Sequence, residues 1–546
     1  MATHIAPEDQ YACVLNEEKS TDRSQRDALQ YSLTPCSWAT EYTTFDPVRF
    51  GRLEGEQDNL IVYGELPKEL DGTWYRLLLD PQFPPHKDNP FIDGDANICA
   101  VRFHNGQVDM KIKYLETERY LLERKANKRL FNIYRNPYSH HPCVRNANDS
   151  NGNTNIISWA GHILALAERG LPWAVDPDTL ETRGYDPFKG QCKAKTFTAH
   201  PKVDPYRNEL VVWGYEAKGL GTQDICVYSV DSVGNIEDEI WIEDPMGGMA
   251  HDGWVTENWI VISSMPFRVT SEEEMKTGGQ HWEFVPDRPS AFLVTPRKRT
   301  ARLPPGWKFG EVRRYIYDNA VIFHTGAAWE EDEQGRLRLE SHFVTFNWFV
   351  FFNPPGQVPP SKARGDWVRW TVELGQPTDT RLQDPQVLCP WMTDFPRTDE
   401  RFLTRKQRIV FLVACDAGRE VTTQGLAFNT IVRLDTETGD MAVFDPGEGS
   451  GVAEPVFVER SPDAAEGDGW ILSWVKRPSA PNGDLVVIDT RDFSKPVAVV
   501  RMPFETRAQV HGNWVPNPNP AVPLPKLTKP IKDIKPSNVG PLTRVP

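Results

Sequence analysis

Short apolar stretches bounded by turn-forming residues recur along most of the chain. Each run is rich in Val, Ile, Leu, Phe or Trp and is flanked by Gly, Pro, Asn or Asp, the pattern of β-strands joined by turns. Clear examples are residues 208–214, 259–264, 408–413 and 469–475. Helical periodicity is scarce, and the best helix candidate is the short segment 116–129. The pattern therefore predicts an all-β protein.

A weak internal repeat indicates how the strands are organised. An apolar strand leads into a turn that begins with aspartate, and another strand follows, at Asp176, Asp231, Asp435 and Asp489. These positions lie 55 residues apart in the first pair (231 − 176) and 54 apart in the second (489 − 435). Such a period holds the four strands and loops of one propeller blade, and about seven such units would account for the body of the chain. Because Asp favours turns in any hairpin, a sandwich or several β-domains are alternatives, but we favour a β-propeller.

The two ends of the chain differ from its body. Residues 1–40 are polar and predict an N-terminal arm, residues 41–515 predict a propeller domain, and the Pro- and Lys-rich residues 516–546 predict an extended C-terminal tail. Within the body, the aromatic run 346–352 predicts a buried strand with one face lining a ligand site. A surface that touches a membrane is the alternative for this run.

Composition narrows the classes of function. The chain of 546 residues carries a formal charge of −15, so nucleic acid is not expected as a partner. It has no run of 18 or more apolar residues, which predicts no transmembrane helix. The N-terminus lacks the basic and apolar regions of a secretory signal, and the eight cysteines are scattered without a Cys-x-x-Cys pair. We therefore expect free thiols and a cytoplasmic protein.

Four histidines in similar apolar settings are candidate metal ligands: His200, His251, His324 and His511. They are separated by 51, 73 and 187 residues (251 − 200, 324 − 251, 511 − 324), so only the fold can bring them together. The inner strands of a propeller meet at one axis and would provide rigid positions for such a set. Four imidazoles suit iron, copper, zinc or nickel better than calcium or magnesium. Taken singly, a histidine beside an apolar run is more often a hydrogen-bonded core residue.

Together with other segments, these histidines resemble the carotenoid cleavage oxygenase family. The other matching segments are residues 91–95, 134–137, 153–155, 251–258, 394–397 and 454–458, and the similarity extends over about residues 45–515. Residues 115–119 and 141–145 are most similar to the fungal branch that includes stilbene-cleaving enzymes. The resemblance implies a seven-bladed β-propeller with a cap of loops and short helices. It also implies a nonhaem Fe(II) on the axis, held by the four histidines, with O2 as co-substrate.

The resemblance also implies residues around the metal. Glu168 is expected behind His251, Asp394 behind His324 and Glu454 behind His511, because a carboxylate that accepts the far N–H of a ligand fixes its tautomer and orientation. Asp394 departs from the glutamate usual in the family and is one methylene shorter, which predicts a weaker hydrogen bond or a displaced strand. Thr154 matches a threonine that crowds an open position of the iron.

Two further positions bear on the substrate. Tyr134 matches a tyrosine that hydrogen-bonds the substrate phenol in stilbene-cleaving relatives, whereas Ala167 stands where those relatives carry a lysine. Alanine cannot hydrogen-bond a phenol, so the alternatives to a stilbenoid are a smaller phenol such as isoeugenol or 4-vinylguaiacol, held by Tyr134 alone, and a substrate without a phenol. The resemblance thus implies an oxygenase that splits an alkene C=C into two carbonyl products, including an aromatic aldehyde such as vanillin.

Three alternatives accompany this hypothesis. Apocarotenoid cleavage would use the same chemistry with a long apolar tunnel. A propeller that binds ligands without turnover has no need of four histidines with matching acids. A zinc hydrolase is disfavoured, because four protein nitrogens would close a tetrahedral zinc site and exclude water.

Overall fold

A computed structural model describes residues 53–528, apart from residues 87, 91, 333–334, 345–351, 353–364, 417–427, 478–479 and 506. The predicted arm 1–40 and the strand predicted at 346–352 lie outside the described residues, except for Phe352. The C-terminal tail is described as far as residue 528.

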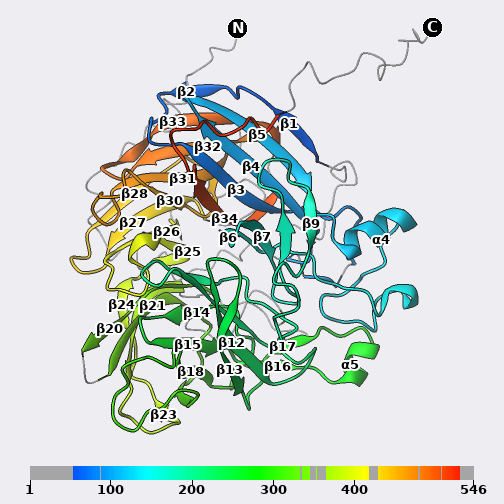
Figure 1. Ribbon diagram of the computed structural model, residues 1–546, viewed down its shortest axis with the longest axis vertical. Coiled ribbons are helices and arrows are strands. Elements are labelled where there is room, and N and C mark those ends of the chain that lie inside the picture. Colours follow the sequence, from blue (N-terminus) through cyan, green and yellow to red (C-terminus); the bar gives the residue numbers. More distant parts are fainter. Residues whose placement is uncertain are drawn as a thin grey trace.

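Seven sheets arranged around a central axis make the protein a β-propeller (Figure 1), as the sequence predicted. The first blade contains, from one edge to the other, β1 (Gly55–Gln57), β5 (Gln107–Tyr114), β4 (Ala96–His104), β3 (Gly72–Leu79) and β34 (Ala508–Pro516). The second contains β6 (Asn155–Trp159), β7 (His162–Leu166), β8 (Trp173–Val175) and β9 (Thr182–Tyr185), and the third contains β10 (Lys202–Asp204), β11 (Glu209–Gly214), β12 (Asp224–Asp231) and β13 (Ile236–Glu243). The fourth contains β14 (Gly253–Val255), β15 (Trp259–Ser264), β18 (Ser290–Pro296), β19 (Arg313–Tyr317) and β23 (Thr380–Arg381).

The remaining three blades follow in chain order. They are β20 (Thr325–Asp332), β21 (Arg336–Val344), β22 (Gly365–Glu373) and β24 (Gln386–Cys389); β25 (Met392–Thr398), β26 (Ile409–Cys415), β27 (Thr430–Asp435) and β28 (Met441–Phe444); and β29 (Gly451–Val452) with β30 (Val456–Glu459), β31 (Gly469–Arg477), β32 (Ala480–Asp489), β33 (Asp492–Glu505) and β2 (Val62–Gly64). A hairpin of β16 (Phe267–Val269) and β17 (Trp282–Phe284) stands apart from the blades.

The aspartate repeat read from the sequence marks equivalent turns in four blades. Asp176, Asp231, Asp435 and Asp489 each lie at the hairpin between the last two strands of a blade in chain order, such as β12 and β13. In each case the carboxylate accepts a hydrogen bond from a backbone N–H two residues further on, from 2.9 to 3.1 Å. The side chain therefore stabilises the turn itself, which explains why aspartate recurs at this point of the blade.

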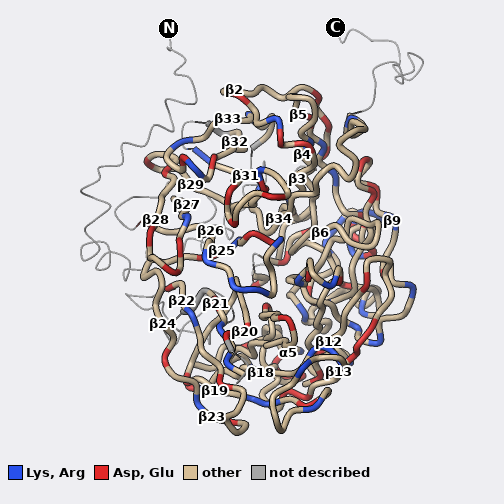
Figure 2. Tube along the Cα trace, turned by 60° about the vertical axis from the view of Figure 1, so that its left-hand side comes forward, with Lys and Arg blue, Asp and Glu red and all other residues tan. Residues whose placement is uncertain are grey.

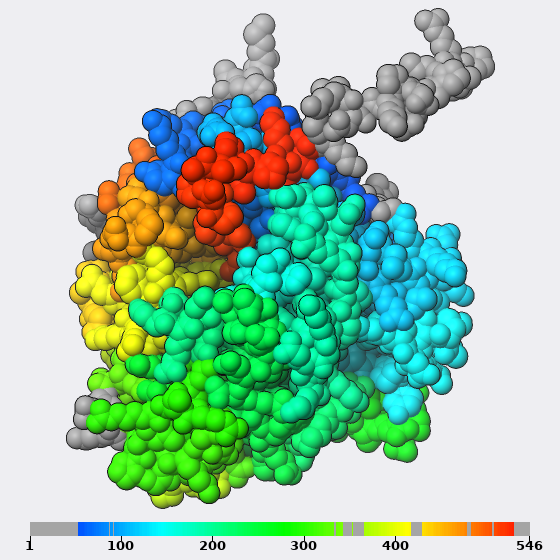
Figure 3. Space-filling model, in the orientation of Figure 1, coloured from blue at the N-terminus to red at the C-terminus, as the bar shows by residue number. Residues whose placement is uncertain are grey.

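The apolar core is divided among the spaces between neighbouring blades. Leu77 and Ile98 of the first sheet pack with Ile163 and Trp173 of the next, and similar clusters fill the spaces between other adjacent pairs. The ring is closed by the chain ends: β34 pairs with β3, and β2 pairs with β33. In the space-filling view the blue start of the described chain accordingly lies against its orange and red end (Figure 3). Closure therefore depends on residues more than 400 positions apart.

Short helices occur in the loops at one side of the propeller (Figure 1). The predicted helix 116–129 is present as α4 (Glu118–Ala126), which begins where Thr117 accepts a hydrogen bond from the Tyr120 N–H and ends at Asn127, whose φ is +50°. The described residues also contain α5 (Glu272–Lys276) and two single turns, η2 (Pro142–Val144) and η3 (Glu400–Phe402).

Three further observations concern the charged residues, the helices and the described part of the tail. Acidic and basic residues alternate along the chain without a large region of one sign in this view (Figure 2). Within the described ranges, no helix has the length and apolar character needed to cross a membrane. Beyond β34 the chain runs without helix or strand over residues 517–528, where Leu527 is buried and Arg102 donates a 2.6 Å hydrogen bond to the Pro525 carbonyl.

Candidate active site

Each of the seven blades brings one site residue to the axis, at or near the start of its innermost strand. These residues are Thr154 before β6, His200 before β10, His251 before β14, His324 before β20, Asp394 in β25, Glu454 before β30 and His511 in β34. Innermost strands begin at one end of the propeller axis, so residues in equivalent positions meet there. The irregular sequence spacing of the histidines thus reflects the number and lengths of the blades that separate them: one blade after His200, one after His251 and three between His324 and His511.

The four predicted histidines converge into one buried cluster. The His200 ring centroid lies 4.5 Å from that of His251, 4.5 Å from that of His511 and 5.1 Å from that of His324. The ligand atoms of His200, His324 and His511 lie within 4.8 Å of one another, and His251 joins them because its Nε2 is 3.0 Å from His200 Nε2. Burial, together with the three neighbouring imidazoles, holds the pKa of His200 well below its usual value, which keeps the ring in the neutral form that binds metals.

A carboxylate lies behind three of the four rings, as the sequence predicted. Nδ1 of His251 is 2.5 Å from Glu168 Oε1, Nδ1 of His324 is 2.6 Å from Asp394 Oδ1, and Nδ1 of His511 is 2.7 Å from Glu454 Oε1. Because each Nδ1–H donates to a carboxylate, the Nε2 lone pair of each ring is free to face the centre of the cluster. The three acids thus select the tautomer that a metal ion requires.

The shorter Asp394 makes a contact as close as those of the two glutamates. The expected weakening of its hydrogen bond is therefore not seen, but the strand is irregular at this point. The pairing of β25 with β26 shifts register between Asp394 and Arg397, and Phe395 has a φ of +48°. Such a bulge re-aims a side chain, and here it compensates for the missing methylene.

The cluster has the features of a metal site for a divalent transition metal. Nε2 of His324 is buried and has no hydrogen-bond partner among the described residues. An unsatisfied buried nitrogen costs about 1–3 kcal/mol, and a coordinated ion would remove that cost. Four neutral nitrogens are a donor set that iron accepts. The residues present therefore fit the metal that the sequence analysis implied.

A narrow pocket reaches the histidines from one side and contains the other predicted residues. Its wall includes Tyr134, Thr154, Ala167, Ile92, Phe323, Phe352, Val510, His251, His324 and His511. The wall also contains polar side chains such as Asn151, Asn153 and Gln509, and the Phe323 ring stacks on His251 with centroids 4.0 Å apart. The structure thus places the proposed substrate residues and the candidate ligands around one space.

A second cavity, of about 420 Å³, reaches the cluster from a different direction. It is lined by His200, His324 and His511 and by polar residues that include Lys202 and Arg397. Lys202 Nζ forms an ion pair at 2.9 Å with Asp252 Oδ1. The histidine cluster is therefore reached by two cavities, and polar side chains line both of them.

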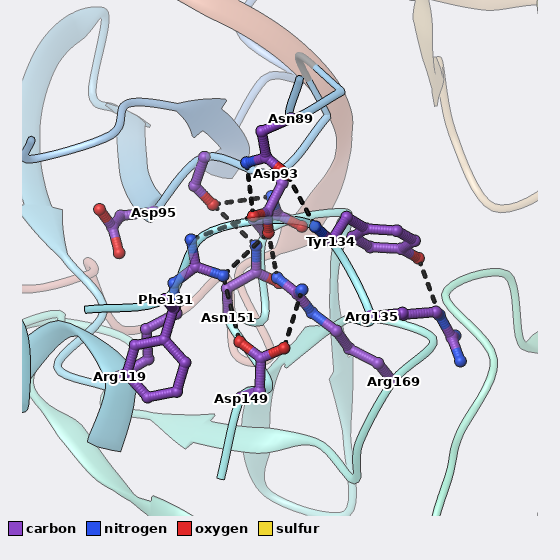
Figure 4. A network of polar contacts seen from close by, with 12 residues as sticks. Asn89, Asp93, Asp95, Arg119, Phe131, Tyr134, Arg135, Asp149, Asn151 and Arg169 are labelled. Carbon is purple, nitrogen blue, oxygen red and sulfur yellow. Dashed lines mark hydrogen bonds and ion pairs between the residues drawn. The ribbon is translucent and has the colours of Figure 1, made fainter. Parts of the chain in front are cut away.

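Two residues that contact the site, Arg135 and Tyr215, were not predicted from the sequence. Arg135 Nε donates to the Tyr134 hydroxyl at 3.1 Å (Figure 4), and the Tyr215 hydroxyl donates to Glu168 Oε2 at 2.9 Å. Arg135 follows Tyr134 within a matching segment, so the sequence contained a signal for it, but its direction depends on a left-handed backbone with φ of +54°. Tyr215 follows β11 and belongs to none of the motifs.

Comparison with known proteins finds relatives along nearly the whole described chain. The family model "RPE65: Retinal pigment epithelial membrane protein" matches residues 50–516. Resveratrol cleavage oxygenase 1 of Botryotinia fuckeliana (strain B05.10) is 50% identical over 470 residues, which cover 85% of this chain and 84% of that protein. Isoeugenol monooxygenase of Pseudomonas nitroreducens is 37% identical over 478 residues, 86% of this chain and 96% of that protein. The crystal structure of Pseudomonas brassicacearum lignostilbene dioxygenase has a TM-score of 0.80 at 35% identity, covering 86% of this chain and 96% of that one.

Proposed function

Because the chain belongs to the family of RPE65 and the carotenoid cleavage oxygenases, we propose that it is an Fe(II)-dependent dioxygenase that cleaves an alkene C=C with O2 into two carbonyl products. The observation that carries the proposal is the convergence of His200, His251, His324 and His511, with carboxylates behind three of them. A propeller that only binds ligands has no need of this arrangement.

The proposed substrate is a 4-hydroxyphenylpropenoid or a stilbenoid, which yields an aromatic aldehyde. Relatives named for cleaving resveratrol, isoeugenol and lignostilbene support this choice over an apocarotenoid. The pocket supports it as well, since its wall combines Tyr134 with the apolar side chains of Phe323, Phe352 and Val510. A phenolic alkene likewise has a polar end and an apolar body.

Each part of the site has a role in this reaction. The four imidazoles would hold Fe(II), which when bound supplies the redox chemistry that O2 needs to react with an alkene. Phe323, Phe352 and Val510 keep water away from the reacting double bond. Tyr134 donates a hydrogen bond to the substrate phenol and so fixes the distance of the alkene from the histidines, which is the kind of positioning that lowers a reaction barrier. Thr154 lines the same pocket and limits the space beside the histidines.

Two broader features remain proposals. The tertiary contacts support a single oxygenase domain over residues 41–515, because β2 and β34 at its ends complete blades whose other strands lie elsewhere in the chain. None of the six described cysteines is disulfide-bonded, which supports a reducing compartment such as the cytoplasm.

The first test is to purify the protein with Fe(II), to measure bound metal, and to assay isoeugenol, 4-vinylguaiacol, resveratrol and an apocarotenoid aldehyde for cleavage that depends on O2. We expect one iron per chain and an aromatic aldehyde from a phenolic substrate. Cleavage of the apocarotenoid alone would support the proposed reaction but refute the proposed substrate class. A protein without metal or turnover would refute the oxygenase.

Ala167→Lys is expected to raise activity on hydroxystilbenes relative to guaiacols. The position lines the pocket together with Tyr134, and lysine would add a donor for the phenol of a longer substrate, worth about 1–3 kcal/mol or roughly a 5- to 100-fold change in relative kcat/KM. The measurement is the ratio of kcat/KM for resveratrol and isoeugenol in the wild type and the variant. An unchanged ratio would show that position 167 does not set specificity.

A further inference from the structure

We propose that Arg135 is a positioning residue that holds Tyr134 ready to bind a phenol and thereby gives the enzyme its preference for substrates with a free 4-hydroxyl group. The inference rests on the proposed function and extends it to a residue outside the predicted site. It also addresses how the pocket recognises a phenol although Ala167 offers no side-chain donor.

Arg135 is held in place by three different partners. Its Nε donates to the Tyr134 hydroxyl at 3.1 Å, its Nη2 donates to the Tyr215 hydroxyl at 3.3 Å, and its Nη1 is ion-paired with Glu216. Glu216 is itself held by His281, whose Nε2 is 2.7 Å away. A planar guanidinium with donors in fixed directions suits this arrangement, since each partner is met by a different nitrogen. The buried charge is thereby fixed directly beside the phenol-binding hydroxyl.

The Tyr134 ring is fixed as firmly as its hydroxyl. The guanidinium carbon of Arg169 lies 4.9 Å from the ring centroid, and the Phe352 ring stacks on it with centroids 6.1 Å apart. Arg169 is anchored by ion pairs to Asp93 and Asp149, within the network shown in Figure 4. These contacts leave the ring little freedom, so the direction of its hydroxyl is decided before a substrate arrives.

The hydrogen bond from Arg135 decides what the Tyr134 hydroxyl can do next. A tyrosine hydroxyl can accept and donate at the same time. Because its oxygen accepts from a cation, its proton is directed elsewhere and is polarised for donation to a phenol oxygen. A substrate with a 4-methoxy group presents a more crowded and weaker acceptor at this point. The arrangement therefore discriminates between a phenol and its methyl ether.

The backbone supports a functional role for this constellation. Arg135, Glu216 and Phe352 all have left-handed conformations, with φ of +54°, +50° and +58°. Residues with a β-carbon disfavour this region, and such conformations gather at functional sites, where the surrounding structure holds them. Here the left-handed conformation is shared by Arg135, which holds the Tyr134 hydroxyl, by its counter-ion Glu216, and by Phe352, whose ring stacks on Tyr134.

The test is Arg135→Lys, measured on isoeugenol and on its 4-O-methyl ether. Lysine keeps a positive charge opposite Glu216 but replaces the Nε donor by a methylene, so the contact to Tyr134 is lost while the ion pair is retained. We expect the kcat/KM ratio of phenol to ether to fall about three- to ten-fold, mostly through KM for the phenol. Tyr134→Phe should reduce the ratio at least as much, and the double variant should reduce it no further than Tyr134→Phe.

Tyr215→Phe is the matched control, because Tyr215 contacts the same guanidinium and also Glu168 but not Tyr134. This variant should change kcat/KM for both substrates equally and leave the phenol-to-ether ratio unchanged. If Arg135→Lys also lowers kcat/KM equally for both substrates, Arg135 has only a structural role and the proposal is wrong. Should that variant not fold, Arg135→Met, whose side chain has no hydrogen-bond donor, is assessed by the same comparison.

Calorimetric binding of the phenol and the ether to the same variants separates this inference from the proposed function. A wild type that binds the phenol more tightly than the ether, with a preference that Arg135→Lys removes, supports the role of Arg135 even if no cleavage is seen. Equal binding of both compounds by the wild type would overturn it.

Discussion

His324→Ala is expected to lose both the metal and alkene cleavage while the protein stays folded. The ring belongs to the histidine cluster, with Nδ1 held by Asp394 and Nε2 buried without a partner among the described residues. Its removal takes away one of four donors. Loss of a residue that merely supports a ligand already costs 10- to 100-fold in metal affinity or activity, so turnover should fall by more than about 100-fold.

The fold should tolerate this change, because the apolar clusters between the blades do not depend on the axis. Metal per chain and activity are measured on the purified variant, and folding is followed by circular dichroism. His104→Ala is the matched control, since His104 is equally buried and pairs with Asp109 at 2.8 Å but lies outside the cluster. It should retain both iron and turnover. If the His324→Ala protein kept full iron and activity, His324 would not be part of the metal site.

Glu454→Gln is expected to weaken both metal binding and the fold. Glu454 is buried, with Oε1 on His511 Nδ1 and Oε2 on both Arg76 Nη1 at 2.7 Å and the Gly512 N–H at 3.0 Å. Burial alone would raise the pKa of this carboxyl, but His511, Arg397 and Arg76 lower it to about 2, so the group is charged at neutral pH. An amide keeps the shape and loses the charge.

Two separate losses follow from this substitution. Arg76 is fully buried and would lose its counter-ion, and breaking a buried pair costs about 3–5 kcal/mol of unfolding free energy. His511 would lose the acceptor that selects its tautomer, which should reduce iron affinity about 10- to 100-fold. Thermal melting and iron titration with a competing chelator measure the two effects.

Glu340→Gln provides the control for this second prediction. Glu340 is a buried glutamate paired with Arg369 at 2.8 Å, in the blade of β20 to β24 and outside the lining of both cavities at the histidine cluster. Burial raises its pKa to about 7 despite Arg369, so its charge matters less at neutral pH. We expect a smaller loss of stability and unchanged iron affinity. An equal loss of iron affinity in both variants would mean that Glu454 acts only through stability.

Much of the fold could be predicted because its signals are local. Alternating or continuous apolar runs predicted strands such as 259–264, now β15, and the aspartates at 176, 231, 435 and 489 marked the same hairpin in four blades. A turn is stabilised by a side chain acting on its own neighbours, so its pattern is visible in a few residues. The four histidines could be singled out in the same way, as residues in similar settings and in a matching order.

The features that only the tertiary structure could decide depend on contacts between distant segments of the chain. For Asp394 the sequence left open a weaker hydrogen bond or a displaced strand; the structure has a register shift between β25 and β26, and the carboxylate lies 2.6 Å from His324. Arg135 was not predicted, because its guanidinium reaches Tyr134, Tyr215 and Glu216 from a left-handed backbone. Pairing of β34 with β3 closes the ring and sets where all seven innermost strands begin. Strands and turns follow from interactions over a few residues, whereas the metal site exists only once a chain of several hundred residues has returned to its start.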